Sequence, residues 1–443
     1  MSAERCLSVS SNGRVIGALL EQNGIWSWVY DDSWLLAPDA FPLSPALPLS
    51  DQRMRDGSTQ RTVQWYFDNL LPEEQMRELL SKEQNVGASD AFGLLERLGA
   101  ESAGSLVLLP PGGPEPELGE LELTHEELSA RIRSLPLTSL TSRSPKRMSL
   151  AGAQHKMVVL FNPETGELRE PLKASASSHI LKPNSRSEQY PHSVINETFT
   201  MRLAHQLGLR VPSVHRLYLP EPVYIIERFD RVWDAETRQW TRMHVIDACQ
   251  LLDQPAVFKY SNANLDTLTR LIHLCRSKAA TRMSVFRWLL FNTLVGNSDS
   301  HLKNISFLIS HEGVQIAPFY DLLCTAVYHA RMYAGDQAIW PDEPLAIPIV
   351  DAAVFGDVTR DKLIRTGVVL GLTPAAATRE VTKMVQQLPL AADALIASME
   401  REFEVIRVAS PQPEVLRATQ GAEAHLLRGV RKLVIADMLK RVA

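Results

Sequence analysis

The chain has 443 residues and the composition of an ordinary globular protein, which is long enough to bury two or three hydrophobic cores. Its formal net charge of −5 argues against a protein that binds nucleic acid mainly through its own basic surface. The four cysteines form no C-x-x-C pair, the start lacks the apolar core of a signal peptide, and no run of 18 apolar residues occurs. These features predict a cytoplasmic protein with reduced thiols, no zinc site and no membrane span.

The first 110 residues predict a small α+β unit. Apolar runs favour strands at 7–10, 15–20, 25–29 and 106–109, and the patterns at 61–74 and 91–98 favour helices or loops. Residues 110–120, P-P-G-G-P-E-P-E-L-G-E, have the Pro, Gly and Glu content of a linker or exposed loop. A second loop, rich in Ser, Thr and basic residues, is predicted at 138–147.

Beyond residue 147 the pattern is typical of a bilobed enzyme with mixed secondary structure. Strands are predicted at 157–161, 178–182 and 223–227, and helices at 196–207 and 284–295. The last third predicts helices that include 376–387, 392–403 and 425–441.

The stretch 297–321 reads N-S-D-S-H-L-K-N-I-S-F-L-I-S-H-E-G-V-Q-I-A-P-F-Y-D. It places Asp299, Asn304 and Asp321 around a predicted β-hairpin, the order in which protein kinases arrange a catalytic base and two metal ligands. We expect Asp299 to accept the proton of an acceptor hydroxyl, and Asn304 and Asp321 to hold Mg²⁺. Each residue alone is equally well explained by a turn or capping role, but the set with its hairpin favours the catalytic interpretation.

Lys182 ends a predicted strand, where a lysine can reach nucleotide phosphates. Glu197 on the next helix is its candidate partner, as in the lysine–glutamate pair of kinases. Glu197 is also explained as a first-turn acid favoured by the helix dipole, and Lys182 and Lys303 as solvated lysines.

Two further segments suit a nucleotide. In S-L-A-G-A-Q-H-K, at 149–156, the small residues at 151–153 let backbone amides approach phosphate oxygens, although A-G-A is also common in turns. The strand end I-E-R-F-D-R, at 226–231, suits an adenine-binding hinge in which Glu227 and Phe229 offer backbone groups. The alternative interpretation is an ordinary strand end at which residues 227–231 are exposed to solvent.

In this order the motifs resemble the HipA family of toxin serine/threonine kinases. The similar segments are M-S-L-A-G-A-Q-H-K at 148–156, H-I-L-K-P at 179–183, N-E-T-F-T-M-R-L-A-H-Q-L-G-L at 196–209, E-R-F-D-R at 227–231, D-A-C-Q at 247–250, N-S-D-S-H-L-K-N at 297–304 and A-P-F-Y-D at 317–321. F-D-N-L-L-P-E at 67–73 and G-A-E-S-A-G-S-L at 99–106 look like the small subdomain that precedes the kinase in full-length members. The resemblance covers nearly the whole chain.

The resemblance implies an α+β, bilobed protein-kinase-like fold with a mixed N-lobe, an all-helical C-lobe and a small N-terminal α+β subdomain. The implied boundaries are 1–110 for the N-terminal subdomain and 111–147 for a linker and the start of the N-lobe. Residues 148–230 would form the N-lobe with gating loop and hinge, and 231–443 the C-lobe with the catalytic loop.

The resemblance also implies roles for single residues. Ser149 corresponds to the autophosphorylated serine of the gating loop, and Asp299 to the catalytic residue. The implied ATP contacts are Ala151, Gly152, Ala153, Gln154, His155, Lys156, Lys182, Glu227, Arg228, Phe229, His301, Leu302, Lys303, Asn304, Tyr320 and Asp321, of which Asn304 and Asp321 are also the implied Mg²⁺ ligands.

Family members are toxins of bacterial toxin–antitoxin pairs. This implies a HipB-like helix-turn-helix antitoxin, operator DNA bound through that antitoxin, and an aminoacyl-tRNA synthetase, often the glutamyl enzyme, as a substrate whose phosphorylation arrests growth and promotes persistence. A competing interpretation is a catalytically silent corepressor of a DNA-binding antitoxin, and a third is a small-molecule kinase of similar architecture. The complete set of base, metal and lysine positions favours the active kinase.

The chain departs from the family pattern at His155, where Glu is common, at Ser300, where Gly is usual, and at Ile246, where an acidic residue is frequent. Residues 338–350, A-I-W-P-D-E-P-L-A-I-P-I-V, do not resemble the expected segment. Phosphate on Ser149 would add about −1.5 to −2 charge beside the ATP phosphates. We therefore expect autophosphorylation to expel the loop and inactivate the enzyme, with the basic residues Arg143, Lys146 and Arg147 holding the loop in its outward position.

Overall fold

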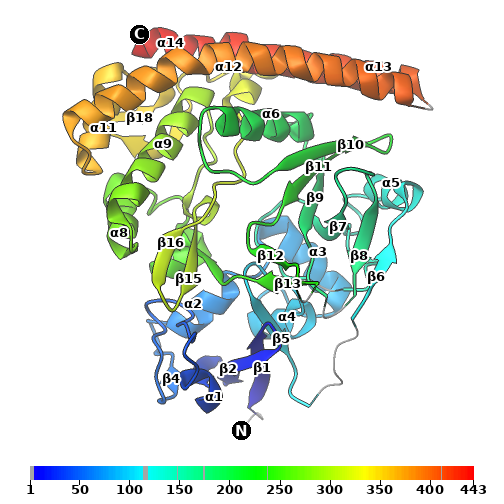
Figure 1. Cartoon of the computed structure of the whole chain (residues 1–443), viewed down its shortest axis with the longest axis vertical. Helices are drawn as coiled ribbons and strands as arrows, with labels where there is room; N and C mark the ends of the chain where they lie inside the picture. Colours follow the sequence, from blue (N-terminus) through cyan, green and yellow to red (C-terminus); the bar gives the residue numbers. More distant parts are fainter. Residues whose placement is uncertain (1–3, 113–117, 147, 173–174, 237, 411) are drawn as a thin grey trace. The chain divides into compact units, whose positions relative to one another are not determined.

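The computed structural model describes residues 4–112, 118–146, 148–172, 175–236, 238–410 and 412–443 (Figure 1). These residues form two compact units. Unit 1 comprises the described residues of Met1–Lys182, Ile225–Lys259 and Ser306–Ala317. Unit 2 comprises Pro183–Tyr224, Tyr260–Ile305 and the described residues of Pro318–Ala443.

Unit 1 begins with a five-stranded antiparallel sheet in the order β4-β3-β2-β1-β5. Its strands are β1 (Arg5–Ser11), β2 (Arg14–Gln22), β3 (Ile25–Tyr30), β4 (Met54–Arg55) and β5 (Leu106–Leu109). Asn12-Gly13 and Asn23-Gly24 connect the first three strands, and all four of these residues have positive φ. Asn-Gly tolerates this backbone at low cost and closes tight hairpins, so the early strands predicted from the sequence are confirmed.

Four short helices accompany this sheet: α1 (Asp32–Leu35), α2 (Thr62–Asp68), α3 (Glu74–Gln84) and α4 (Ala91–Leu98). Of these, α1, α2 and α4 contact its strands, and α3 contacts α4. The Asp90 side chain caps α4 by accepting from the Gly93 N–H, which fixes the predicted helix start. Aromatic rings form the core between helices and sheet, with Trp26 edge-on to Phe92 at 5.3 Å and Trp28 tilted on Phe67 at 5.6 Å.

A six-stranded sheet has the order β10-β11-β9-β7-β8-β6. Its strands are β6 (Glu120–Glu122), β7 (Met157–Phe161), β8 (Leu168–Pro171), β9 (His179–Pro183), β10 (Val214–Tyr218) and β11 (Pro222–Glu227), and α5 (His125–Arg133) follows β6 in the chain. The predicted strands at 157–161, 178–182 and 223–227 are confirmed within one residue at each end. Their central positions are buried, as continuous apolar runs predict.

Unit 1 also holds two smaller sheets. The ribbon β12 (Arg231–Asp234) with β13 (Gln239–Arg242) follows the strand end at 227. The second sheet joins β14 (Val245–Asp247), β15 (Ser306–Ser310) and β16 (Gly313–Ile316), and α7 (Ala248–Leu251) follows β14. β15 and β16 are the hairpin predicted within the stretch 297–321, and this prediction is confirmed.

Unit 2 is mainly helical. Its larger helices are α6 (Ser193–Gln206), α8 (Leu265–Leu274), α9 (Lys278–Val295), α11 (Arg360–Val369), α12 (Pro374–Ala409) and α13 (Pro413–Gly429), which continues through a π-helical stretch, Val430–Ile435, into α14 (Ala436–Val442). The short α10 spans Arg331–Ala334. The second half of α9 is buried without interruption, and Trp288 stacks on Phe319 at 5.8 Å. No helix within the described residues is long and apolar enough to cross a membrane.

Two expectations about this region are corrected. The helices predicted separately at 376–387 and 392–403 are one helix, α12, which runs through Pro389. Its buried residues recur every three or four positions on both sides of the proline, so packing offsets the hydrogen bond that proline removes. The region predicted to be an all-helical C-lobe also contains strands, among them the hairpin of β17 (Pro344–Ile349) and β18 (Ala352–Val354), where closely spaced prolines exclude a helix.

One buried carboxylate joins distant segments of unit 1. Glu101 is fully buried, and its carboxylate forms ion pairs with four cations: Lys146 at 2.5 Å, Arg228 at 2.7 Å, Arg231 at 2.8 Å and Arg242 at 3.2 Å. Burial alone would raise the pKa of Glu101, but these cations more than reverse that effect and hold the pKa well below its usual range. We call these five residues the Glu101 cluster.

Removing the Glu101 charge should destabilise unit 1 strongly. Glu101→Gln leaves several buried cations without their counter-ion, which typically costs about 3–5 kcal/mol. Glu120→Gln is the matched control, because Glu120 forms an exposed ion pair with Arg169 at 3.4 Å and such pairs contribute about 1 kcal/mol or less. Urea unfolding at pH 7 measures both effects, and equal losses in the two variants would contradict the assignment.

A buried histidine, just before β14, joins three segments of the first 110 residues within unit 1. His244 Nε2 lies 2.9 Å from the Leu43 carbonyl and 3.2 Å from the Tyr66 hydroxyl, and Nδ1 lies 3.3 Å from the Ser105 hydroxyl. Burial lowers the pKa of His244 to about 4, so the folded protein keeps this ring neutral.

This histidine should make stability depend on pH. Its pKa is about 6.5 in the unfolded chain, so the unfolded state binds the proton first and stability falls as pH drops from 6.5 towards 4. The expected loss is roughly 3 kcal/mol. His244→Gln should show a shallower loss in urea unfolding between pH 7 and 4, and exposed His125→Gln should follow the wild type. Parallel curves for all three proteins would rule out this role for His244.

Candidate active site

The catalytic stretch begins where a buried helix of unit 2 ends. Gly296 terminates α9 in the left-handed conformation, with φ of +72°, and a Cβ there would lie within 3 Å of Val434 and Ala326. Only glycine meets both requirements. Asn297 then folds the chain back: its side chain donates to Asn292 and accepts from the Asp299 N–H at 3.0 Å. Asp299 is therefore presented by a rigid turn.

The Asp299 main chain is held from both sides. Its carbonyl accepts hydrogen bonds from the His301 N–H at 2.9 Å and from the Asn304 side-chain amide at 2.8 Å. Its half-buried carboxylate accepts from the Tyr260 hydroxyl through Oδ1. A carboxylate fixed in this way can orient a hydroxyl group and accept its proton.

The residue before Asp299 is also braced. The Ser298 N–H donates to the Thr325 hydroxyl at 2.6 Å, and the Ser298 hydroxyl donates to Glu343. Glu343 is 3% exposed, and burial raises the pKa of its carboxyl. His329 lies 3.6 Å away and acts in the other direction, lowering this pKa. Glu343 lies in the segment 338–350 that departs from the family pattern, and no motif in the sequence predicts this contact.

The two predicted metal ligands fit a hard cation. The side-chain amide nitrogen of Asn304 donates to the Asp299 carbonyl, so the amide oxygen of Asn304 is the atom that would bind a metal. Asp321 supplies a half-buried carboxylate and holds a left-handed backbone, with φ of +58°, which is uncommon outside glycine. The preceding Tyr320 donates its hydroxyl to the Lys303 carbonyl at 2.9 Å, which fastens this strand end to the catalytic loop.

The other predicted contacts of the catalytic loop are mostly buried. His301, Leu302 and Lys303 are each less than a tenth exposed, and Leu302–Asn304 forms a 3₁₀ turn. Leu302 contributes an apolar side chain to the interior, so only its backbone is suited to a nucleotide.

In unit 1 the predicted gating serine is anchored inward. The Ser149 side chain is fully buried, and its hydroxyl donates to the Leu70 carbonyl at 2.6 Å. The Ser149 N–H donates to the Glu101 carbonyl at 2.7 Å. Both acceptors belong to segments of the first 110 residues, so this part of the chain holds the loop in the observed position.

The loop 151–156 is built around one close contact. Gly152 has φ of +106°, and the Lys156 ammonium donates to the Ala151 carbonyl at 2.6 Å. A Cβ on Gly152 would lie 2.6 Å from the Lys156 nitrogen, so a larger residue would displace the lysine. Of the other predicted contacts here, Ala153 is exposed, and Gln154 and His155 are half-buried.

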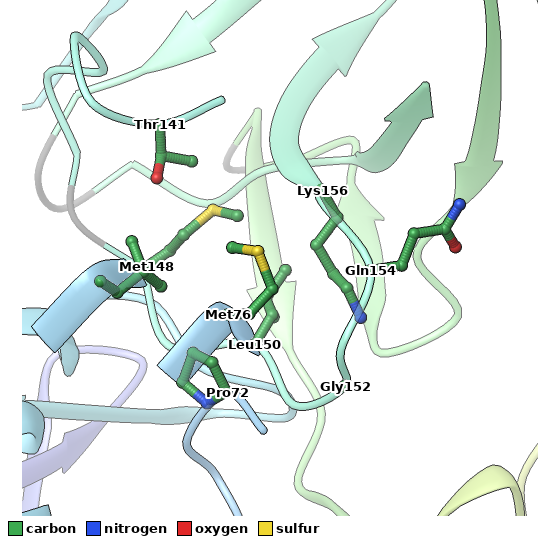
Figure 2. Close-up of a pocket in the computed structure, with 9 residues that line it drawn as sticks. Pro72, Met76, Thr141, Met148, Leu150, Gly152, Gln154 and Lys156 are labelled. Carbon is green, nitrogen blue, oxygen red and sulfur yellow. The ribbon is translucent and has the colours of Figure 1, made fainter. Parts of the chain in front are cut away.

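A small pocket lies beside this loop (Figure 2). Figure 2 shows Lys156 directed back towards Gly152, and the thioethers of Met76 and Met148 turned towards each other. The lining residues are Pro72, Met76, Leu80, Thr141, Met148, Leu150, Gly152, Gln154 and Lys156. Flexible methionines adapt to different neighbours, so this packing suits a loop that changes position.

The remaining nucleotide candidates of unit 1 lie on β9, at the end of β11 and just after β11. Lys182 is 8% exposed, Glu227 is exposed and Phe229 is half-buried. Glu197 belongs to unit 2, so its pairing with Lys182 stays a prediction. Within unit 2, burial raises the pKa of Tyr224 well above its usual range, and the nearby Glu197 and Asp321 carboxylates add to this rise.

Two predicted roles are corrected by the Glu101 cluster. The Arg228 guanidinium binds Glu101 and Asp230. The main-chain N–H of Arg228 donates to the Ser178 carbonyl, and its main-chain carbonyl accepts from the Arg231 N–H. Arg228 therefore has a structural role, and we do not retain it as a nucleotide contact. Lys146 is equally committed to Glu101, so it is not available to hold a displaced gating loop, whereas Arg143 is exposed. Arg147 lies outside the described residues.

Comparison with known proteins shows the family of this chain. Residues 148–392 match the HipA-like C-terminal domain, and residues 7–109 match the HipA N-terminal domain. The putative kinase Y4mE of Sinorhizobium fredii is 35% identical over 338 residues, which cover 73% of this chain and 78% of that protein. The chain belongs to the HipA family of kinases.

Two Shewanella oneidensis comparisons support the same family. The serine/threonine-protein kinase toxin HipA of that organism is 31% identical over 316 residues, which cover 68% of this chain and 70% of that protein. A chain of the solved complex of HipA, HipB and operator DNA from strain MR-1 superimposes with a TM-score of 0.78 at 25% identity, covering 98% of this chain and 97% of that chain. The α+β, kinase-like fold and the kinase class predicted from the sequence are thereby confirmed.

Sequence reasoning missed the roles of two residues that the structure shows. Glu101 lies in the segment G-A-E-S-A-G-S-L, which resembles the family, but no periodic pattern in the sequence predicts that its side chain is a buried counter-ion. Tyr260 lies 39 residues before Asp299 and outside every motif that resembles the family. Only the fold brings the two residues together.

Proposed function

We propose that this chain is an ATP-dependent serine/threonine protein kinase and the toxin of a toxin–antitoxin pair. The observation that carries the proposal is the fixed Asp299, whose neighbours Asn304 and Asp321 offer two oxygen ligands in the order that kinases use. A silent corepressor has no need for a carboxylate held by this many contacts.

In the proposed reaction, Asp299 orients the acceptor hydroxyl and takes its proton as the oxygen attacks the γ-phosphorus of ATP. The bond between that phosphorus and the β–γ bridging oxygen breaks, and ADP leaves. When bound, Mg²⁺ would neutralise phosphate charge, held by Asn304 and Asp321. Lys182 and the backbone of 151–156 would bind phosphates, with Glu227 and Phe229 at the adenine. His301, Lys303 and Tyr320 would complete the nucleotide contacts.

The proposed partners follow from the family. The similar HipA of Shewanella oneidensis is solved together with HipB and operator DNA. We propose a helix-turn-helix antitoxin of the same kind for this chain, with operator DNA bound through it, because the net charge of −5 does not favour DNA binding by the kinase itself. The proposed substrate is a translation component, an aminoacyl-tRNA synthetase of the glutamyl type in the first instance, whose phosphorylation would arrest growth and promote persistence.

Ser149 is the proposed site of inhibitory autophosphorylation. In the observed position its hydroxyl is a buried donor to the Leu70 carbonyl. A phosphate ester has acceptor oxygens and about −1.5 to −2 charge, so it cannot replace this donor in a buried position. The modified loop would have to leave, and the phosphate-binding backbone at 151–156 would leave with it.

Asp299→Asn should abolish phosphoryl transfer but preserve ATP binding. The amide keeps the shape and the hydrogen-bonding oxygen but cannot act as a base, and loss of a general base typically costs about 10²–10⁴ in rate. Label transfer from γ-labelled ATP to a casein-type acceptor or to the chain itself measures the rate, and calorimetry measures ATP affinity. Full activity in this variant would remove Asp299 from the mechanism. ATP binding without transfer in the wild type would instead favour the corepressor interpretation.

Phosphorylation of Ser149 should open the gating loop. Amide hydrogen exchange of peptides covering 148–156 should increase in the phosphorylated protein, because the bonds to Leu70 and Glu101 are lost. ATP affinity should fall in parallel. Ser149→Ala supplies the control, since alanine fits the buried site and keeps the N–H bond to Glu101. Equal protection and equal ATP affinity in the phosphorylated and unmodified proteins would exclude this gating mechanism.

A further inference from the structure

Tyr260 contacts the predicted catalytic carboxylate directly. Its hydroxyl donates to Asp299 Oδ1, and its ring lies edge-on to His301, with centroids 4.8 Å apart and planes at 84°. Tyr260 is nevertheless 47% exposed. All of these residues belong to unit 2. The ring therefore has a defined resting place beside Asp299 and an open path to solvent.

The backbone that carries this ring is fixed independently of it. The Tyr260 carbonyl accepts from the Ala263 N–H at 2.9 Å, and Asn264 caps helix α8 by accepting from the Thr267 N–H. Rotation of the Tyr260 side chain away from Asp299 thus needs no change in the surrounding secondary structure.

The phenol is also not needed to hold the catalytic loop in place. The Asp299 main chain already has bonds to Asn297, His301 and Asn304, and Ser298 is braced by Thr325 and Glu343. The Tyr260 hydroxyl bonds to the Asp299 carboxylate, the group that an acceptor hydroxyl must reach.

We propose that Tyr260 is an internal stand-in for the acceptor hydroxyl. A phenol donating to Asp299 Oδ1 reproduces the hydrogen bond that a serine or threonine acceptor makes in the reaction. The acceptor has to replace this phenol before transfer can occur. This inference rests on the proposed kinase function, and it deepens that function by adding a residue that governs which acceptors succeed.

Such a stand-in discriminates against water. A water molecule that displaces the phenol forms one hydrogen bond to Asp299 in place of the one that is lost. Water therefore competes poorly with the phenol for the carboxylate. A protein acceptor docks through additional contacts, and these offset the loss of the Tyr260–Asp299 bond. The expected result is a kinase that hydrolyses little ATP when no protein acceptor is bound.

The test compares Tyr260→Phe with Tyr333→Phe. Phenylalanine keeps the ring on His301 and removes only the hydroxyl. Tyr333 is a matched control, since it packs on Tyr328 in the same unit, 5.8 Å between centroids, and no hydrogen bond of its hydroxyl is observed within the described part of the chain. Both changes are made in a Ser149→Ala background to remove the predicted autophosphorylation, and ADP release from Mg-ATP is followed without protein acceptor.

Tyr260→Phe should raise ADP release by roughly threefold or more, the effect of losing one hydrogen bond to a charged group. Tyr333→Phe should leave it unchanged. The increase should disappear in a Tyr260→Phe/Asp299→Asn double variant. Unchanged or lower ADP release in Tyr260→Phe would overturn the inference. If Asp299→Asn does not lower ADP release in the parent protein, the proposed kinase function itself fails, and the two failures are thus distinguishable.

A second readout does not depend on activity. In protein labelled with 3-fluorotyrosine, the ¹⁹F resonance missing from Tyr260→Phe identifies this ring. Asp299→Asn should shift that resonance, because the phenol then loses its charged acceptor, while the Tyr333 resonance should stay in place. A Tyr260 resonance that is insensitive to Asp299→Asn would show that the contact is not formed in solution and would overturn the inference.

Discussion

The buried charge of Glu101 is the constraint on which unit 1 depends. Its carboxylate draws cations from separate parts of the chain: Lys146 before the gating loop, Arg228 and Arg231 at the strand end, and Arg242 on the β12–β13 ribbon. A buried anion without these partners would be unstable, and so would each buried arginine without the anion. The N-terminal segment and the strands β7, β8 and β9 therefore belong to one compact unit.

The same residue connects stability to the proposed regulation. The Glu101 carbonyl accepts the Ser149 N–H while its carboxylate anchors the cluster, and Leu70 accepts the Ser149 hydroxyl. The N-terminal segment is thus the surface that receives the gating loop in its inward position. Unit 2 is organised differently, since the Asp299 loop donates neutral hydrogen bonds to Asn297 and Thr325, accepts one from Asn304, and is also held by the buried carboxylate of Glu343.

The sequence predicted those elements whose causes are local. Apolar runs located the early strands and those at 157–161 and 223–227, and the hairpin between Asn304 and Asp321 was predicted from its strand and turn residues. It failed where long-range packing decides. Helices were predicted at 376–387 and 392–403, but a buried stripe makes them one helix, α12, that continues through Pro389. Arg228 was a predicted nucleotide contact because it corresponds to the hinge of the HipA family, whereas its side chain forms buried ion pairs with Glu101 and Asp230.

Two contacts of the candidate site were beyond sequence reasoning for the same reason. Tyr260 and Glu343 stand far from Asp299 in the chain and belong to no periodic pattern or spacing rule. The segment that holds Glu343 departs from the family pattern, so resemblance gave no guide to it either. Side chains that act on a catalytic group from a distant segment become visible only when the fold is known.

The central claim is that the Asp299 loop makes this chain an active protein kinase. The most direct test incubates the dephosphorylated full-length chain with γ-labelled ATP and Mg²⁺ and maps the phosphorylated residues by mass spectrometry. The account predicts label on Ser149. Absence of label on any residue and on an added protein acceptor, in protein that binds ATP, would contradict it.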